Sequence, residues 1–242
     1  MKKNIYRFLK LHYWSRKVLL SKFARIFYSE KDVRKKIFKS IYESYHWRDY
    51  KKPEDNESIS GRGSDIIKTE RFVKEFNIFL KKNKITKILD LGCGDFLWMK
   101  NTIVDLPDLI SYHGIDIVES LINKNKKKFS NEIIKFSCKD FFEEKIEGDY
   151  EIIIIRDVFI HLYNKNIIKF LEKIKLTNAK YIAITSTSSI LKNKDLKKEG
   201  RYRDINIEIE PFNLNSPQYK LSDIEDINKK DFLNIYEISK IK

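Results

Sequence analysis

The sequence predicts an α/β fold in which helices cover both faces of a mostly parallel, twisted sheet. Two observations carry this prediction. Short apolar runs alternate with amphipathic helical patterns through the middle of the chain, as in consecutive βαβ units. Two of only seven glycines follow the first of these runs directly, in the stretch KILDLGCGDFLWM at 87–99. Glycines there suit a tight turn between a buried strand and a helix.

The individual elements follow from local periodicity. Apolar residues recur at helical spacing in the segments 4–28, 31–45, 66–82, 117–128 and 164–175. Short apolar runs predict strands at 87–91, 111–116, 133–137, 150–155 and 180–185. The run EIIII suits a central strand that is buried on both faces. Beyond 190 the alternation ends, and 219–224 and 232–241 are candidates for two further strands.

Positive charge is concentrated near the N-terminus. The 242 residues carry a formal net charge of +14. Residues 1–51 hold 15 lysines and arginines against four acids, which leaves a charge of only +3 for the rest. We therefore expect a basic helical extension over 1–50 and a single α/β domain over 51–242.

The two cysteines, Cys93 and Cys138, are isolated from each other and from any Cys/His ligand spacing. This pattern disfavours a disulfide framework and a metal site, and it fits a reducing compartment. The sequence has no run of about 18 apolar residues, so we expect no membrane-spanning helix. No small-residue cleavage site follows the basic N-terminus, so we expect no signal peptide. We expect a cytoplasmic location.

A strand followed by Gly-x-Gly and a helix is an arrangement that binds nucleotide cofactors. A dinucleotide fingerprint needs a third glycine at position 97, where this chain has Leu97. Asp90 precedes the loop and Asp95 follows it. Two carboxylates would repel a pyrophosphate, whereas they would attract a cationic sulfonium amino acid.

The pattern Asp-x-Gly-x-Gly resembles motif I of the class I S-adenosylmethionine (SAM)-dependent methyltransferases. The resemblance implies a Rossmann-like fold, with SAM as cofactor and 51–242 as the methyltransferase domain. The residues of this loop that it assigns to the cofactor are Asp90, Gly92, Cys93, Gly94 and Asp95. A tight turn after a buried strand, without a ligand, is the alternative interpretation.

Two later segments extend the resemblance. Asp116 ends the second predicted strand, where a carboxylate can accept hydrogen bonds from both ribose hydroxyls. In the family, an acid and an apolar residue after the third strand meet the adenine, which implies this role for Asp140 and Phe141. The alternatives are a solvated acid at the strand end for Asp116 and plain core packing for Phe141.

The segment RDVFIHL at 156–162 follows the fourth strand, at the carboxyl edge where ligands bind in open α/β sheets. We expect Arg156, Asp157 and His161 to face the reacting methyl group. His161 is the candidate general base, with Asp157 orienting it or acting itself. Arg156 could hold an anionic acceptor. A salt bridge with a helix-capping Asp157 and a structural His161 is the alternative.

The chain also resembles small bacterial SAM-dependent methyltransferases associated with surface-polysaccharide and sugar modification, over about 36–241. The matching segments are SGRGS (60–64), CGDFLWM (93–99), RDVFIHL (156–162) and YRDINIEIEPFNLNSP (202–217). This resemblance implies methyl transfer to an oxygen of a sugar or glycan-related molecule. SGRGS could close over the cofactor, with Ser60, Arg62 or Ser64 meeting its carboxylate, or be a flexible linker. Arg62 and Asp204 depart from the small residue or proline usual at these positions.

Aromatic and basic side chains are interleaved over residues 1–30. Such a helix suits peripheral contact with an anionic membrane, here its inner face, or packing on the domain or on a second subunit. Two other functions stay open: a nucleic-acid-directed methyltransferase and a non-catalytic SAM-binding protein. The charge of +3 outside the N-terminal segment disfavours nucleic acid as a partner.

Overall fold

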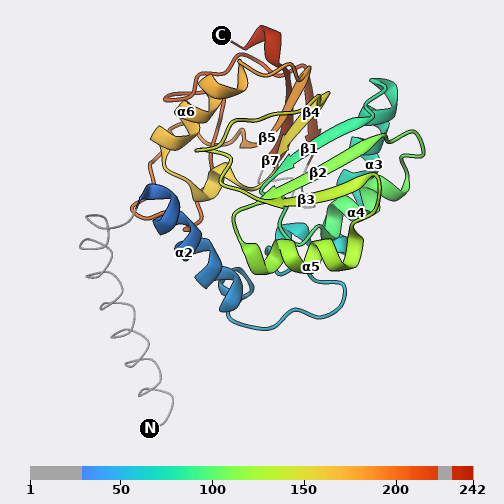
Figure 1. The fold of residues 1–242 in the computed structure, drawn as a ribbon. Coiled ribbons are helices and arrows are strands. Elements are labelled where there is room, and N and C mark those ends of the chain that lie inside the picture. The colour runs from blue at the N-terminus through green and yellow to red at the C-terminus, as the bar shows by residue number, and fades with distance from the viewer. Residues whose placement is uncertain (1–28, 223–230, 242) are drawn as a thin grey trace.

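The computed structural model describes residues 29–222 and 231–241. Their core is a seven-stranded sheet with the order β3-β2-β1-β4-β5-β7-β6 (Figure 1). Strands β1 to β5 pair in parallel, and β7 and β6 complete the edge in antiparallel pairing. This confirms the predicted mostly parallel sheet. The strands are β1 Lys87–Leu91, β2 Ser111–Asp116, β3 Ile134–Cys138, β4 Ile152–Ile155, β5 Tyr181–Thr187, β6 Tyr219–Ser222 and β7 Asp231–Glu237.

The helices lie on both faces of the sheet. Strands β1 to β3 advance in one direction and β4 to β5 in the other, so right-handed crossovers put α4 and α5 on the face opposite to α6. Figure 1 shows α6 on one side of the sheet and α3 on the other. The helices are α2 Glu30–Glu43, α3 Ile66–Lys82, α4 Leu97–Val104, α5 Glu119–Phe129 and α6 Asn164–Ile174, with short 3-10 turns η1 His46–Arg48, η2 Arg62–Ser64, η3 Phe159–His161 and η4 Ile238–Lys240.

Strand β4 occupies the centre of the sheet, between β1 and β5. Its four isoleucines are completely buried, as the run EIIII predicts. Ile152 and Ile154 pack with α3 and α4, while Ile153 and Ile155 pack with α2 and α6. The alternation of side chains along one strand therefore joins two separate apolar layers.

The last predicted strand is shorter than expected. Residues 232–241 were candidates for one strand, but β7 ends at Glu237 and η4 follows it. Pairing with β5 ends where Tyr181 lies opposite Glu237. The next amide, of Ile238, donates to Lys180 O, and the amide of Ile241 donates to Ile238 O, which closes a turn. Residues 223–224 of the other candidate strand lie outside the described residues.

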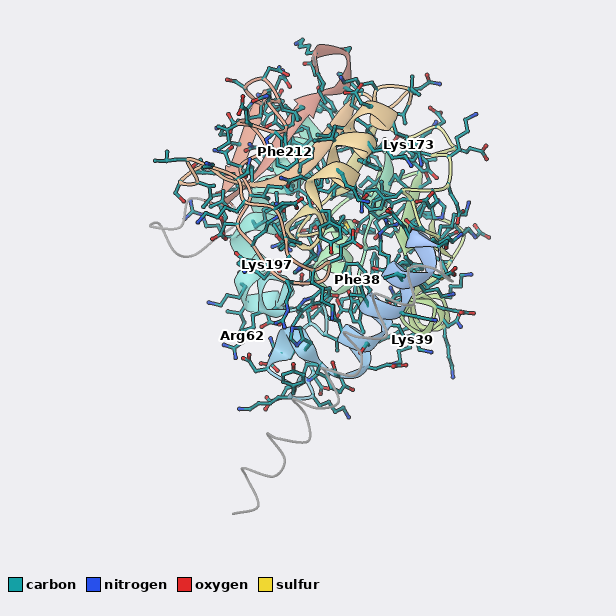
Figure 2. The ribbon with its side chains drawn as sticks, turned by 90° about the vertical axis from the view of Figure 1, so that its left-hand side faces the viewer. Phe38, Lys39, Arg62, Lys173, Lys197 and Phe212 are labelled. Atoms are coloured by element: carbon teal, nitrogen blue, oxygen red, sulfur yellow. The ribbon has the colours of Figure 1, made fainter. Side chains whose placement is uncertain are left out.

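Helix α2 falls within the predicted extension and packs against the α/β domain. Phe38, Ile41 and Tyr42 are buried in the layer that also contains α6. Figure 2 shows Phe38 on the inner side of α2 and Lys39 on its outer side. Three exposed ion pairs connect α2 with later segments: Lys31–Glu144, Lys35–Glu119 and Lys165–Glu30. The boundary at residue 50 stays a prediction.

The basic helix predicted over 4–28 lies outside the described residues. Within the part of the chain that the structure describes, no helix combines the length and the apolar character needed to cross a membrane.

Candidate active site

A pocket opens at the carboxyl ends of β1, β2 and β4, where the strand order changes direction. In open α/β sheets this is the place where ligands bind. Ten of the twelve site residues predicted from the sequence line this pocket: Gly92, Cys93, Gly94, Asp95, Asp116, Asp140, Phe141, Arg156, Asp157 and His161. Asp90 and Arg62 are not among the lining residues that the structure describes.

The two glycines of the loop after β1 are required by conformation and by their neighbours. Gly92 has φ +79° and Gly94 has φ +57°, in the region that residues with a side chain rarely adopt. A Cβ at Gly92 would lie 2.4 Å from Val158 Cγ2, and one at Gly94 would lie 2.3 Å from Ser60 Oγ. The turn therefore brings the loop after β1 into contact with SGRGS and with the loop after β4.

Asp95 holds the segment that contains SGRGS. Its carboxylate accepts hydrogen bonds from Ser58 Oγ and from the amide of Ile59, both at 2.9 Å. The amide of Asp95 donates to Ser60 Oγ at 3.1 Å. Burial raises the pKa of the Asp95 carboxyl. SGRGS is thus fixed over the glycine loop rather than being a free linker.

Arg62 lies outside the pocket. Its side chain is 70% exposed and pairs with Asp49, with 2.8 Å between Nη2 and Oδ2. In Figure 2 Arg62 lies near the periphery of the molecule. Ser60 and Ser64 of the same segment do line the pocket. The expected contact between Arg62 and a cofactor carboxylate is therefore not supported by its position.

Asp90 belongs to the interior of the sheet. Its carboxylate accepts a hydrogen bond from Tyr112 Oη at 2.8 Å, and the side chain is buried. Burial raises the pKa of this carboxyl to about 7. Neighbouring Ile88 belongs to the layer of α3 and α4, and alternation puts Asp90 on that same face. The pocket thus gains no direct contact from Asp90.

Asp116, at the end of β2, is a buried carboxylate beside the glycine loop. Its two oxygens accept hydrogen bonds from the amides of Gly94, at 3.2 Å, and Val118, at 2.9 Å. Burial raises the pKa of Asp116 to about 6. Asp116 therefore takes up a proton, and loses its negative charge, at a higher pH than an exposed aspartate does.

Asp140 and Phe141 form the wall of the pocket after β3. Asp140 pairs with Arg34 of α2, with 2.5 Å between Oδ2 and Nη1, and accepts a hydrogen bond from the amide of Phe142 at 3.1 Å. Phe141 lines the pocket and also packs edge-on against Phe170 of α6, with 5.4 Å between ring centroids. The two interpretations of Phe141, ligand wall and core residue, are therefore compatible.

Arg156 connects β4 with SGRGS. Its Nη2 donates to Gly63 O at 2.8 Å, and Nη1 lies 3.3 Å from Asp157 Oδ2. The guanidinium group also lies over the rings of Phe72 and Trp98, about 5 Å from each centroid. These contacts make Arg156 a fixed part of the pocket wall. The salt bridge with Asp157, which belongs to the alternative interpretation of this segment, is present.

Asp157 has φ +57°, a conformation that is uncommon for a residue other than glycine. Its amide donates to Thr185 Oγ1 of β5 at 2.8 Å, and its side chain remains 31% exposed. Such conformations occur often at functional sites, where the surrounding structure maintains them. The turn presents this carboxylate at the mouth of the pocket.

His161 is buried and stacks on Trp47, with ring centroids 4.6 Å apart. Its Nδ1 lies 3.1 Å from Arg201 O. A carbonyl only accepts, so we assign the proton of the neutral ring to Nδ1 and the lone pair to Nε2. Burial lowers the pKa of His161 to about 4, so the imidazole is neutral at pH 7.

The first described helix contributes to the pocket, which the sequence did not predict. Arg34, Phe38 and Tyr42 of α2 and Trp47 of η1 all line the pocket. The strong positive charge of residues 1–51 suggested a separate surface segment, yet Arg34 is only 3% exposed. The concentration of aromatic residues at 38–47 was a usable signal, because exposed helices seldom carry so many.

The charge of the pocket is opposite to that of the chain. The lining contains four carboxylates, Asp95, Asp116, Asp140 and Asp157, and two guanidinium groups, Arg34 and Arg156. A ligand that carries positive charge is therefore favoured over a polyanion.

Comparison with known proteins supports the fold. No protein-family model and no curated protein matches the sequence. Among solved structures, magnesium protoporphyrin IX methyltransferase (ChlM) from Synechocystis PCC 6803 with bound SAM is 15% identical, with a TM-score of 0.55, over 86% of this chain and 96% of that one. The methyltransferase domain of bacterial CtHen1 is 12% identical, with a TM-score of 0.52, over 70% of this chain and 98% of that one.

A third structure, the PH0226 protein from Pyrococcus horikoshii OT3, is 18% identical with a TM-score of 0.51, over 70% of this chain and 88% of that one. At such identities the similarity establishes the architecture. The chain has the Rossmann-like fold found in SAM-dependent methyltransferases.

Proposed function

We propose that this protein binds SAM in the pocket and transfers its methyl group to an acceptor. The observation that carries the proposal is the position of Asp116. It is a buried carboxylate at the end of β2, hydrogen-bonded to the amide of Gly94 in the glycine loop, at the switch point of the sheet. There it can accept bonds from ribose hydroxyls, as a carboxylate does at this place in related folds.

The residues present fit the cofactor. Asp140 and Phe141 would hold the adenine, and Asp116 the ribose. The carboxylates of the lining favour the sulfonium and ammonium groups of SAM. Trp47 Nε1 is buried and has no hydrogen-bond partner among the described residues, which suits a pocket where a bound ligand supplies an acceptor. When bound, SAM supplies an activated methyl group.

The protein has then to position the acceptor and remove its proton. We propose that His161 accepts the proton of an acceptor hydroxyl at Nε2, because its Nδ1 is bonded to Arg201 O and the ring is neutral at pH 7. Asp157 would steady the imidazolium that forms. A pKa of about 4 makes His161 a weak base in the free protein, so bound acceptor and Asp157 have to raise it. Arg156 would fix the pocket wall and attract any anionic group on the acceptor.

The acceptor we propose is an oxygen of a sugar or glycan-related molecule, on the resemblance of the segments SGRGS, RDVFIHL and YRDINIEIEPFNLNSP to methyltransferases of that kind. The test is to incubate the full chain with methyl-labelled SAM and separate fractions of nucleotide sugars, lipid-linked glycans and RNA. Label in a sugar-containing fraction supports the proposal. Label in RNA supports the nucleic-acid alternative, and SAM binding without any labelled product supports a non-catalytic role.

We further propose that residues 1–30 contact anionic membranes. The support is their sequence, in which basic and aromatic residues are interleaved without an acid before Glu30. An acceptor carried on a lipid would make this contact useful. Deleting residues 1–28 should lower co-sedimentation with anionic vesicles, and an unchanged, salt-insensitive partition would contradict the idea.

A further inference from the structure

Arg34 of α2 faces two carboxylates at the wall of the pocket. It is 3% exposed, and its Nη1 lies 2.5 Å from Asp140 Oδ2. Its Nε lies 3.8 Å from Glu199 Oε2 and has no hydrogen-bond partner among the described residues. One guanidinium group thus lies between an acid of the loop after β3 and an acid from the segment after β5.

Glu199 begins the segment that fixes His161. The amide of Gly200 donates to His161 O at 2.8 Å, and Arg201 O accepts from His161 Nδ1 at 3.1 Å. A Cβ at Gly200 would lie 2.6 Å from Ile41 Cδ1 of α2, so helix and segment are in direct contact. The helix that carries Arg34 therefore packs on the same segment that orients the imidazole.

We propose that Arg34 is a positioning residue that couples the cofactor side of the pocket to the acceptor side. The inference rests on the proposed function, because Asp140 is the carboxylate assigned to adenine. A ligand amino group that donates to Asp140 would fix this carboxylate, and with it Arg34 and α2. The position of α2 in turn sets the segment 199–201 and the ring of His161.

The contact between Arg34 and Glu199 is longer than a hydrogen bond, and this supports the coupling. A charge-assisted hydrogen bond between nitrogen and a carboxylate oxygen is about 2.7–2.9 Å long, about 1 Å shorter than the separation of Arg34 Nε and Glu199 Oε2. A small displacement of α2 toward Glu199 would complete the bond and satisfy a buried donor. Binding at Asp140 therefore has a defined route to the acceptor side.

Stability alone gives a weak reason for this arrangement. The cost of removing two charges from water largely offsets their attraction, so an apolar group of similar volume would stabilise the fold as well. Within the described residues, no exposed basic residue of α2 makes the contacts that Arg34 makes with Asp140 and Glu199. Lys39 pairs with Glu43 on the solvent side, with both side chains more than half exposed. Lys39 therefore offers a matched control on the same helix.

The test measures binding of S-adenosylhomocysteine (SAH) and amide hydrogen exchange of the full chain with and without it. In the wild type we expect SAH to slow exchange in the glycine loop, in α2 and in 199–203. Arg34→Met should raise the Kd of SAH about tenfold or more, since a charged partner of Asp140 is lost. At saturating SAH this variant should keep the slowed exchange of residues 92–95 but lose it in α2 and 199–203.

Glu199→Gln separates the two halves of the proposal. It leaves the pair between Arg34 Nη1 and Asp140 Oδ2 in place, so the Kd of SAH should stay within about twofold of wild type. The slowed exchange of 199–203 should nevertheless disappear. Lys39→Met should match the wild type in both measurements.

Each outcome decides a different point. If the folded wild type does not bind SAH, the proposed function fails and the coupling fails with it. If the wild type binds but Arg34→Met shows the same Kd and the same protection of 199–203, only the coupling is overturned. If Arg34→Met does not fold, Glu199→Gln decides, and unchanged protection of 199–203 in that variant overturns the coupling.

Discussion

Replacing Gly94 by alanine should destabilise the protein and deform the pocket together. The new Cβ would lie 2.3 Å from Ser60 Oγ and 3.1 Å from Ser60 Cβ, at a backbone φ of +57°. The left-handed conformation costs about 1–2 kcal/mol for a residue with a Cβ, and overpacking costs about 1–3 kcal/mol more. We expect a loss of about 2–5 kcal/mol in the free energy of unfolding, and a fall in Tm on the order of 10 °C.

Thermal unfolding with and without SAM measures this prediction, with Gly63→Ala as the control. Gly63 belongs to the neighbouring segment, has no positive φ, and its Cβ would come no closer than 3.3 Å to Asp157 Oδ2. Gly63→Ala should lower the free energy of unfolding by less than about 1 kcal/mol. Combining Gly94→Ala with Ser60→Gly should recover the loss of unfolding free energy that overpacking causes. It should not recover the loss that the left-handed backbone causes. The reasoning is refuted if Gly94→Ala unfolds at the temperature of the wild type, or if the two changes are simply additive.

Four further predictions concern ligand binding, the pH dependence of binding and of stability, and the N-terminal segment. Asp116→Ala should raise the Kd of SAM and SAH about 10- to 100-fold, because two hydrogen bonds to a charged group are lost. Since the pKa of Asp116 is raised to about 6, SAM affinity should be full above pH 7 and fall below pH 6, and calorimetry should find this dependence flattened in Asp116→Asn. The pKa of His161 is about 4 when folded and 6.5 when exposed, so between these values the unfolded chain binds a proton that the folded chain rejects. Acidification from pH 6.5 to 4 should thus cost up to about 3 kcal/mol of stability, and chemical unfolding of His161→Gln should lack this component while SAM binding persists. Deletion of residues 1–28 should leave SAM affinity unchanged, and a truncated chain that no longer folds would instead favour packing of this segment on the domain.

The sheet and the glycine loop could be predicted because their signals are local. Side-chain period and the switch from strand to helix are read within a few residues, and most predicted elements begin and end within two residues of the observed ones. The strand ends then had to meet at one edge, which brought Asp116, Asp140 and His161 into one pocket.

The contribution of α2 could not be predicted, because it depends on contacts between residues far apart in the chain. The pair of Arg34 and Asp140 spans 106 positions. The same limit explains the two site residues that the pocket does not include. The position of Asp90 directly before the loop suggests a contact with the cofactor, whereas alternation along β1 directs its side chain to Tyr112. The charge of Arg62 suggests a contact with the cofactor carboxylate, but its guanidinium group forms an ion pair with Asp49 of the preceding turn.

The central claim is that the pocket holds SAM against Asp116. Isothermal titration of the full chain with SAM and SAH, in parallel with Asp116→Ala, tests it most directly. We predict saturable one-site binding of both compounds to the wild type, weakened about 10- to 100-fold in the variant, while the circular dichroism of the two proteins is the same. Absence of heat and of any Tm shift when SAM or SAH is added to the folded wild type would contradict the claim, and so would equal binding by Asp116→Ala.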